Sequence, residues 1–583
     1  MTWTQAINPL GSIGLSALVA AIPIFFLFIA LAGLRMKGHI AGLITVVLAI
    51  AVAVLAYGMP AQYAIMSTLY GAMFGLFPIG WIVVTVVFLY NLTVKTGQFE
   101  IIKDSIASIT EDRRLQALLI AFSFGAFLEG AAGFGTPVAI TGAMLVGLGF
   151  NPLYAAGICL IANTAPVAWG AIGIPIITAG AITGLDAMSI SQMTGRQLPL
   201  LSLFVPFWLI FIMSGWKGAK EVMPAILVSG GSFAVMQWFS SNYLSPMLPD
   251  IMSSLTSMIC LVLFLRVWKP QNTWRFADEP PVTMTIKQHS SGAILKAWSP
   301  FIILTMLIGD WGLRPVKALL DAVSIKIPFE GLTNMIIAGG KPIAVVYTFN
   351  WLSAAGTAIL ITAILTAFIL RISPSRFFGI MGETLKNLRF ALLTIACVLG
   401  FAYVANWSGM TPTLGKAFTI TGVVFPFMAA FLGWLGVFIT GSDTSSNALF
   451  GNMQKVTAES MGINPVLTVA TNGAGGVAGK MISPQSIAVG CASTGLLGRE
   501  GDLFRFTLPH SIFFTVLIGI VAMLQAYVFP WMIPQAIKAS AAAAGASGGG
   551  STILIGTAVV VLILGVIAYM QNSGTSEAKK AGA

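Results

Sequence analysis

Residues Phe127 to Pro137 read FLEGAAGFGTP, and residues Phe438 to Leu449 read FITGSDTSSNAL. Each stretch interrupts a long apolar segment with glycines, small hydroxyl or amide residues and one carboxylate, Glu129 or Asp443. Backbone that leaves the helical conformation at membrane depth is tolerated only where protein buries it or where it lines a wet cavity. We therefore predict that the two stretches form the walls of one polar site near the middle of a bilayer.

The composition indicates that lipid surrounds most of the chain. Of its 583 residues, 57% are hydrophobic and 8% are charged, against roughly 25% charged residues in an average soluble domain. The formal net charge is +11, but Lys and Arg stand at the ends of apolar runs rather than in a patch with aromatic residues. This pattern indicates membrane topology and argues against nucleic acid as a partner. The four cysteines show no metal-site spacing, so no disulfide framework, metal or other cofactor is expected.

Apolar runs of about 20 residues, the length a helix needs to cross the hydrocarbon core, recur along the chain. They cover 12–34, 38–57, 67–90, 197–214, 221–240, 250–267, 295–311, 346–370, 386–405, 507–528 and 551–571. Gly, Pro, Asn and Ser break the apolar pattern in segments 115–148, 153–183, 421–456 and 465–496. We predict an all-α polytopic membrane protein in which 115–148 and 421–456 are re-entrant hairpins, while 153–183 and 465–496 are broken helices.

With this arrangement most Lys and Arg residues fall on one side of the membrane, as the positive-inside rule expects. The N-terminus is then outside and the C-terminus is cytoplasmic, as is the loop 269–295. The exception is the segment 314–341, which carries basic residues on the outer side.

An internal repeat follows from the same landmarks. Tyr90, the motif GFNPL at 149–153 and Asn163 recur as Tyr403, GINPV at 462–466 and Asn472, with an offset between 309 and 313 residues. The predicted topology orients the two copies oppositely, which is the inverted-repeat plan of secondary transporters with the substrate at the repeat interface. The expected domains are N-terminal scaffold helices (1–66), repeat 1 (67–196), further scaffold helices (197–345), repeat 2 (346–506) and C-terminal helices (507–583).

The helix breaks point to a small anionic substrate. Asn163 and Thr164 precede Pro166, and a residue before proline is pushed out of helical geometry. In segment 465–496 we expect the same kind of break at Asn472 and the glycines 473, 475 and 476, and then at Lys480 and the pair Ser483-Pro484. Freed amides at a half-helix start suit a carboxylate, and freed carbonyls suit a cation or a protonated group. The substrate-binding candidates are Asn163, Thr164, Trp169, Ser442, Ser445, Asn447, Asn472, Gly473, Lys480 and Ser483.

Lys480 is the basic residue that we place at membrane depth, where a charge needs a partner or a ligand. It either anchors the substrate carboxylate or forms a structural ion pair with Glu129 or Asp443. Glu129 and Asp443 each either carry the transported proton, since apolar surroundings favour the neutral acid, or cap the helix that follows. Both alternatives remain open from the sequence alone.

Other features carry weaker hypotheses. The Ser, Thr and Asn residues of the second hairpin would also suit sodium, and His510 is either a proton relay or a structural residue. Trp169 either packs on the substrate or lies in the core. A proton-translocating subunit of a membrane complex would need ionisable residues on several successive spans. An intramembrane enzyme would need a nucleophile and base or metal ligands at depth, and the three histidines, two of them in loops, and the lack of an HExxH motif argue against this class.

Longer motifs resemble a known family. FGAFLEGAAGFGTPVAI, NTAPVAWGAIGIP, TGSDTSSNALFG and NGAGGVAGKMISPQS are similar to signature stretches of the bacterial L-lactate permease family, and the likeness extends over about residues 10–530. The resemblance implies an inner-membrane symporter of L-lactate, and in relatives D-lactate and glycolate, with a proton. It also implies a fold like that of the ion transporter superfamily, with paired re-entrant hairpins in a mobile transport domain. A homo-oligomer would be in keeping with such a scaffold.

Overall fold

Helices form almost all of the secondary structure in the part of the chain that the computed structural model describes, residues 2–534 apart from 35, 134, 278, 280–286 and 313. Within that part, nine helical segments are long and apolar enough to cross a membrane, and two bent helix pairs raise the number to as many as 11. The chain is a multi-pass membrane protein, as its composition predicts. The expected span at 551–571 lies outside the described residues.

Part of the N-terminal helical region packs against a long helix of the second half, and the helices of this region follow in chain order. They are α1 (Ile13–Ala20), α2 (Ile22–Phe28), the π-helical turn η1 (Ile29–Gly33), α3 (Gly38–Leu55), α4 (Ala61–Phe74), η2 (Gly75–Gly80), α5 (Trp81–Lys95) and α6 (Gln98–Ala107). The expected span 12–34 is a helix pair bent by 41°. Helix α19 (Pro374–Ser408) runs along α3 and α4. Gly71 allows this approach, because a Cβ there would lie 2.4 Å from the carbonyl oxygen of Leu399.

The first re-entrant hairpin forms where the sequence predicts it. Its ingoing arm consists of α7 (Arg113–Gln116), η3 (Ala117–Phe124) and α8 (Gly125–Ala131), and α9 (Thr136–Gly147) returns. Gly135 precedes α9 with φ of 81°, a left-handed conformation that glycine adopts without steric cost. Pro137 lies in the first turn of α9, where the missing amide hydrogen costs nothing. Local residue chemistry therefore determines the turn.

The first broken helix is confirmed as well. Helix α10 (Pro152–Ala162) ends at Asn163, and the chain continues through the 3₁₀ turn η4 (Val167–Trp169) into α11 (Gly170–Thr183). The two parts are bent by 62°. A short helix, α12 (Ala187–Thr194), completes this half.

The middle of the chain supplies further long helices and a small outer sheet. The helices are α13 (Leu198–Glu221), α14 (Met223–Phe239), η5 (Ser240–Leu244), α15 (Pro249–Val267), α16 (Ser291–Gly312) and α17 (Arg314–Asp321). Strand β1 (Trp3–Thr4) pairs in parallel with β3 (Ile336–Ala338), which pairs antiparallel with β4 (Lys341–Pro342). The pairing brings 314–341 to the N-terminal side, as the topology predicts.

The helix predicted at 346–370 starts later in the structure than the sequence indicates. Residues Val346–Phe349 form strand β5, which pairs antiparallel with β2 (Ile325–Pro328), and helix α18 starts only at Ala355 and ends at Ile369. The β-branched and aromatic residues of VYTF favour a strand once a partner strand is adjacent. The fold is therefore helical with short strands rather than strictly all-α.

The second half repeats the element order of the first. After α18 and α19 it contains α20 (Met410–Phe418), η6 (Thr419–Val424), α21 (Phe425–Thr440), α22 (Asp443–Ser460), α23 (Pro465–Lys480), α24 (Pro484–Thr494), α25 (Glu500–Tyr527) and η7 (Pro530–Met532). Helices α21 and α22 form the second hairpin, with Gly441 at φ of 70° in its turn. Asn151 and Asn464 cap α10 and α23 in the same way, each side chain accepting a hydrogen bond from the amide two residues later.

The second helix breaks only at the last of the places where the sequence predicts a break. Helix α23 continues through Asn472 and Gly473, and the chain leaves the helix only at 481–483. The glycines serve close packing, because a Cβ on Gly475 would lie 2.1 Å from the carbonyl oxygen of Ala430 and one on Gly479 would lie 2.2 Å from that of Trp434. Small residues let membrane helices approach in this way, and the contact with α21 outweighs the low helix propensity of glycine, about 1 kcal/mol per residue.

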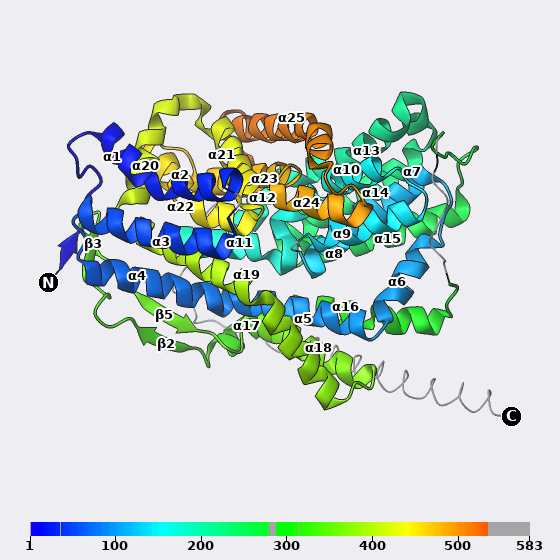
Figure 1. The fold of residues 1–583 in the computed structure, drawn as a ribbon, viewed down its shortest axis with the longest axis horizontal. Coiled ribbons are helices and arrows are strands. Elements are labelled where there is room, and N and C mark those ends of the chain that lie inside the picture. Colours follow the sequence, from blue (N-terminus) through cyan, green and yellow to red (C-terminus); the bar gives the residue numbers. More distant parts are fainter. Residues whose placement is uncertain are drawn as a thin grey trace.

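The two hairpins enter from opposite ends of the molecule. The Arg113 guanidinium lies 5.9 Å from the centre of the Phe150 ring, which places both ends of the first hairpin together. In the second hairpin, Thr457 Oγ1 donates to the Gly415 carbonyl at 2.9 Å, and Thr413 Oγ1 nearby donates to the carbonyl of Ile7 at 2.6 Å. Helices α7 and α20 lie at opposite ends of the long axis (Figure 1). The repeats are therefore inverted.

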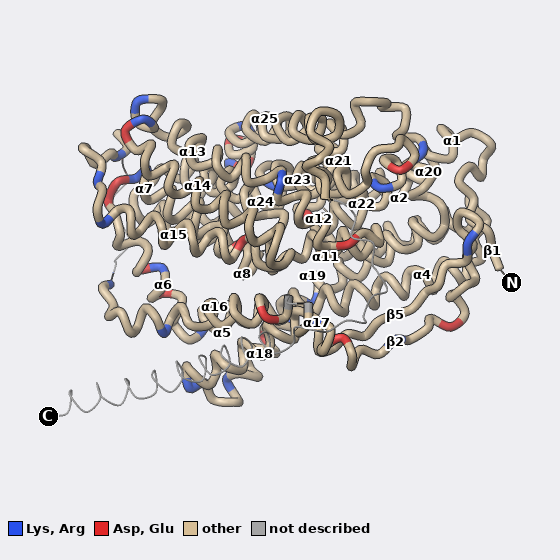
Figure 2. Tube along the Cα trace, turned by 180° about the vertical axis from the view of Figure 1, so that it is seen from behind, with Lys and Arg blue, Asp and Glu red and all other residues tan. Residues whose placement is uncertain are grey.

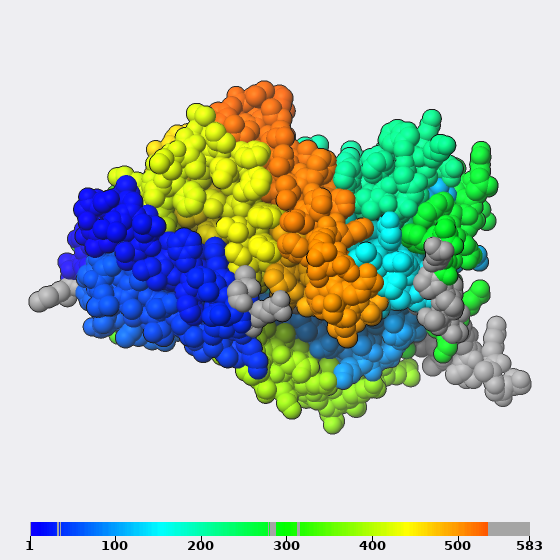
Figure 3. Space-filling model, turned by 45° about the horizontal axis from the view of Figure 1, so that its top comes forward, coloured from blue at the N-terminus to red at the C-terminus, as the bar shows by residue number. Residues whose placement is uncertain are grey.

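Loops that the topology places on one side lie together. Arg114 Nη1 contacts Glu221 Oε2 at 2.8 Å, and its Nη2 donates to the Asn272 carbonyl at 3.1 Å. His289 Nε2 lies 2.8 Å from Asp104 Oδ2. Figure 2 shows charged positions mainly at the periphery of the helical body. In Figure 3 second-half segments in yellow and orange lie between N-terminal helices in blue and first-half and middle segments in cyan and green.

Candidate functional site

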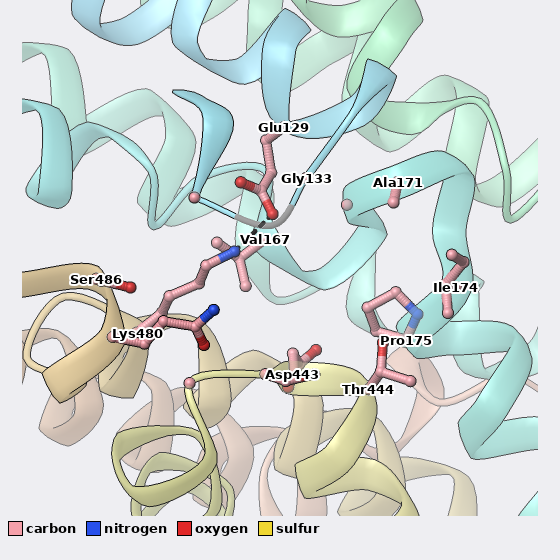
Figure 4. Close-up of a pocket in the computed structure, with 15 residues that line it drawn as sticks. Glu129, Gly133, Val167, Ala171, Ile174, Pro175, Asp443, Thr444, Lys480 and Ser486 are labelled. Carbon is pink, nitrogen blue, oxygen red and sulfur yellow. Dashed lines mark hydrogen bonds and ion pairs between the residues drawn. The ribbon is translucent and has the colours of Figure 1, made fainter. Parts of the chain in front are cut away.

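A cavity of about 70 Å³ lies where the hairpin turns meet the helix breaks of both halves. One water needs about 10–15 Å³ of such space, so the cavity admits a molecule of a few non-hydrogen atoms. Its lining residues are Glu129, Gly133, Gly135, Val167, Gly170, Ala171, Ile174, Pro175, Gly441, Ser442, Asp443, Thr444, Lys480, Gln485 and Ser486. In Figure 4 Glu129 enters from above and Asp443 from below, so each half supplies one wall.

Lys480 and Glu129 form an ion pair across this cavity. Lys480 is the last residue of α23, and its Nζ lies 2.7 Å from Glu129 Oε1 (Figure 4). The side chains are 11% and 3% exposed. Glu129 Oε2 has no hydrogen-bond partner among the described residues. The structural ion pair considered for Lys480 is thus present with Glu129, and it stands in the cavity wall where a ligand would reach the ammonium.

Several helix N-termini converge on the cavity. Ser442 caps α22, its Oγ accepting from the Ser445 amide at 3.2 Å, and Ser483 caps α24 in the same way toward Ser486. Gly135 precedes α9. A helix N-terminus carries a partial positive charge and free amides, which favour an anion. Together with Lys480 they give the cavity a positive wall.

The start of α11 is strained beside the cavity. Ala171, Ile172 and Gly173 have φ of 45°, 60° and 72°. A left-handed conformation costs a residue other than glycine roughly 1–3 kcal/mol, so the surrounding packing must hold this turn. Gly173 fits against the carbonyl oxygen of Pro246, from which a Cβ would be 2.1 Å away. Gly170 leaves room for Glu129, whose Oε1 would lie 2.6 Å from a Cβ there.

Asp443 lines the cavity without a partner. It is 3% exposed, and neither carboxyl oxygen has a hydrogen-bond partner among the described residues. It faces Gly476, where a Cβ would lie 2.3 Å from Asp443 Oδ1. Asp443 does not cap α22, because Ser442 does, and Glu129 lies inside α8 rather than at the start of α9. The capping hypothesis is therefore wrong for both acids.

Asn447 and Asn472 form a layer behind the cavity. Asn472 Nδ2 donates to Asn447 Oδ1 at 2.9 Å, and Asn447 Nδ2 donates to the Pro175 carbonyl at 3.2 Å. Gln454 Nε2 donates to Asn472 Oδ1 at 3.1 Å. Gly473 keeps the space beside Asp443 and Asn447 open. These amides tie α22 and α23 to α11 and do not line the cavity.

The remaining predicted residues lie outside the cavity lining. Thr164 Oγ1 donates to the Ile161 carbonyl at 2.7 Å, and Trp169 Nε1 donates to Ser191 Oγ at 3.1 Å, so both serve the core. Asn163 ends α10, with its Oδ1 buried and unpartnered among the described residues. His510 Nδ1 accepts from Trp208 Nε1 at 3.2 Å, within α25 rather than at its start. Ser445 contributes its backbone amide to the Ser442 cap.

Sequence reasoning missed lining residues at the start of α24 and one acid near the cavity. Gln485 and Ser486 line the cavity because the true break places the start of α24 there. Asp250 is 1% exposed in the first turn of α15, beside the tip of the first hairpin. The signal for Asp250 was an acid at the start of an apolar run. Within the described ranges no cluster of three or more His, Cys, Asp or Glu suits a metal ion.

Known proteins resemble this chain over almost its whole length. The profile of a family described as L-lactate permease matches residues 16–529. L-lactate permease of Bacillus subtilis (strain 168) is 58% identical, covering 92% of this chain and 100% of the relative. Glycolate permease GlcA of Escherichia coli (strain K12) is 54% identical over 91% of this chain and 100% of its own. Neisseria gonorrhoeae MtrF, a solved structure, is 14% identical with a TM-score of 0.47 over 86% of this chain and 97% of its own, too distant to carry an argument.

Proposed function

Because the chain belongs to the L-lactate permease family, we propose that it takes up L-lactate, and also D-lactate and glycolate, by proton symport across the bacterial inner membrane. The observation that carries this proposal is the buried ammonium of Lys480 in a small cavity on which helix N-termini converge. An ionisable side chain at membrane depth is costly and marks a functional site by default. The relatives are named permeases, so transport rather than catalysis is the activity we propose.

The cavity offers each part of a short 2-hydroxy acid a suitable neighbour. The carboxylate would lie between Lys480 and the amides at the starts of α22 and α24. The hydroxyl would reach Ser442 or Thr444, and the methyl group of lactate would face Val167 and Ile174. Glycolate lacks that methyl group, and one methyl group in an apolar pocket changes affinity by about 1–3 kcal/mol. This size argument supports transport of both acids with unequal affinity.

Proton coupling is supported by the unpartnered acid Asp443. A buried carboxylate without a hydrogen bond is costly, and the neutral acid avoids that cost. Glu129 has its negative charge balanced by Lys480. When a substrate carboxylate takes up the ammonium, Glu129 loses its partner and takes up a proton. Substrate loading and protonation then depend on each other.

Alternating access follows from the inverted plan. In such transporters one unit moves against another around a fixed site. We propose that the two hairpins and broken helices move against scaffold helices of 1–66 and 197–345, which also offer a homo-oligomer contact. The side with Arg114 and Lys95 would be cytoplasmic and the N-terminal strand would be outside, as the distribution of basic residues favours.

Purified protein in liposomes tests the proposal directly. Uptake of labelled L-lactate is measured with an inward proton gradient, with an inward sodium gradient and with neither. We expect the proton gradient alone to accelerate uptake, and unlabelled glycolate and D-lactate to compete. Uptake that follows sodium and ignores protons would establish the sodium-coupled alternative.

A further inference from the structure

Asp250 is a third buried carboxyl beside the cavity, and the function proposed above does not use it. It lies in the first turn of α15, where it is 1% exposed. A Cβ built on Gly130 would lie 2.7 Å from the Cβ of Asp250. Gly130 follows Glu129 at the tip of the first hairpin, so Asp250 stands at the point where that tip meets α15.

The carboxyl of Asp250 makes no hydrogen bond, among the described residues, that would give it a structural role. Neither of its oxygens has a partner among the described residues. It does not cap its own helix, because the position before α15 is Leu248 and no side chain accepts a capping hydrogen bond there. A buried polar group without a partner calls for a specific explanation.

The electrostatic surroundings of Asp250 are simple. Glu129 on α8 and Lys480 on α23 are the charged groups that act on it. The other elements packed against α15 are η3, α11 and α14, whose residues include no titratable side chain, and η5, which carries only the exposed Tyr243. The charge on Lys480 is already matched by Glu129 at 2.7 Å.

An ionised Asp250 would therefore add an unbalanced negative charge in a dry contact, next to Glu129. Isolated buried carboxylates are strongly disfavoured and become neutral instead. The observed contact between Gly130 and Asp250 is thus compatible with the protonated acid. A carboxylate at this place would repel Glu129 and compete for Lys480.

We propose that Asp250 holds a proton that couples protonation to the docking of the first hairpin on α15. The proton binds a carboxylate oxygen as an O–H when the contact forms. It returns to water as the hairpin separates from α15 and the carboxylate becomes solvated. This inference rests on the proposed proton symport and deepens it, because it assigns a proton site to the scaffold side rather than to the hairpins.

The variant Asp250→Asn tests the inference, because asparagine resembles the neutral acid in size and shape. Net uptake driven by a proton gradient is compared with lactate exchange across liposomes that contain lactate on both sides and no gradient. We expect exchange within about twofold of wild type and a loss of at least about fivefold in stimulation by the gradient, the lower end of ordinary coupling between sites. The matched control is Asp310→Asn, which changes a partly buried acid of α16 and should keep the stimulation.

A second variant, Gly130→Ala, separates docking from protonation. Its added methyl group meets Asp250 in every protonation state, so exchange and gradient-driven uptake should both fall. An Asp250→Asn protein that keeps wild-type stimulation, or that fails to fold, would overturn the role of Asp250. Wild-type protein that ignores the gradient would instead overturn the proposed symport.

Discussion

Neutralising the buried pair tests whether Lys480 binds substrate or only supports the fold. The set comprises Lys480→Met, Glu129→Gln and the double variant. Lys480 Nζ and Glu129 Oε1 lie 2.7 Å apart, and the two side chains are 11% and 3% exposed. Removing one partner of such a buried pair lowers stability by about 3–5 kcal/mol, because the other charge is left uncompensated. In the Lys480 variant, Glu129 Oε1 would lose its ion-pair partner, and Oε2 already has no hydrogen-bond partner among the described residues.

The double variant should recover most of that stability. Replacing a buried ion pair by neutral side chains of similar volume is often close to neutral, so we expect unfolding free energy within about 1 kcal/mol of wild type. Lactate affinity should not recover. A hydrogen bond to a charged group contributes about 1.5–3 kcal/mol, which corresponds to roughly 10- to 100-fold in affinity.

Two measurements test the expected changes in unfolding free energy and in lactate affinity. Denaturant unfolding of the protein in detergent, followed by tryptophan fluorescence with and without saturating lactate, reports stability and binding. Lactate uptake into liposomes reports transport. A double variant that regains both stability and near-normal lactate affinity would refute the anchoring role and leave Lys480 as a structural partner of Glu129. Single variants as stable as wild type would refute the buried ion pair itself.

Three further predictions follow from the packing, the caps and one loop. Gly475→Ala should destabilise the α21 and α23 contact by about 1–3 kcal/mol, because its Cβ would lie 2.1 Å from the Ala430 oxygen, whereas Gly231→Ala on α14 meets no atom within 4 Å and should be neutral or stabilising in thermal unfolding. Ser442→Ala removes the cap of α22, so it should lower the unfolding free energy by about 1 kcal/mol and weaken lactate binding. Ser442→Asp should restore the cap and the stability, but its negative charge should repel the anion. Burial raises the pKa of Glu279, but the hydrogen bond and charge of Arg113, with those of Arg275, outweigh it and lower that pKa below the ordinary 4.5. The Glu279 contact therefore stabilises the loop above the ordinary pKa and is lost as the pH falls through the lower folded-state value. Hydrogen exchange in 271–277 should rise over that acidic range in wild type and show no such step in Glu279→Gln.

Local chemistry predicted the elements that depend on a few neighbouring residues. Pro166 breaks α10 from α11, and Gly135 and Gly441 allow the hairpin turns. These features need no distant partner, because proline and glycine restrict or permit backbone angles wherever they occur. The repeat offset predicted the inverted plan for a similar reason, since each copy carries its own turns.

Features that depend on a distant surface were not readable in advance. The glycines of α23 are compatible with a helix break or with close helix packing. They serve packing in the structure, because α21 lies against them. Thr164 and Trp169 have the right chemistry for a site, but the path of the chain between α10 and α11 directs their side chains into hydrogen bonds of the core.

The sequence by itself determined a helical membrane protein with two polar, inverted units and identified Glu129, Asp443 and Lys480 as the ionisable residues of one site. Only the tertiary structure decided that Lys480 pairs with Glu129, that Asp443 has no hydrogen-bond partner in the described part of the chain and that Asp250 joins them from α15. The reason is physical: residue type sets what a side chain can do, but burial, pairing and distance come from elements far apart in the chain that share one dry interior.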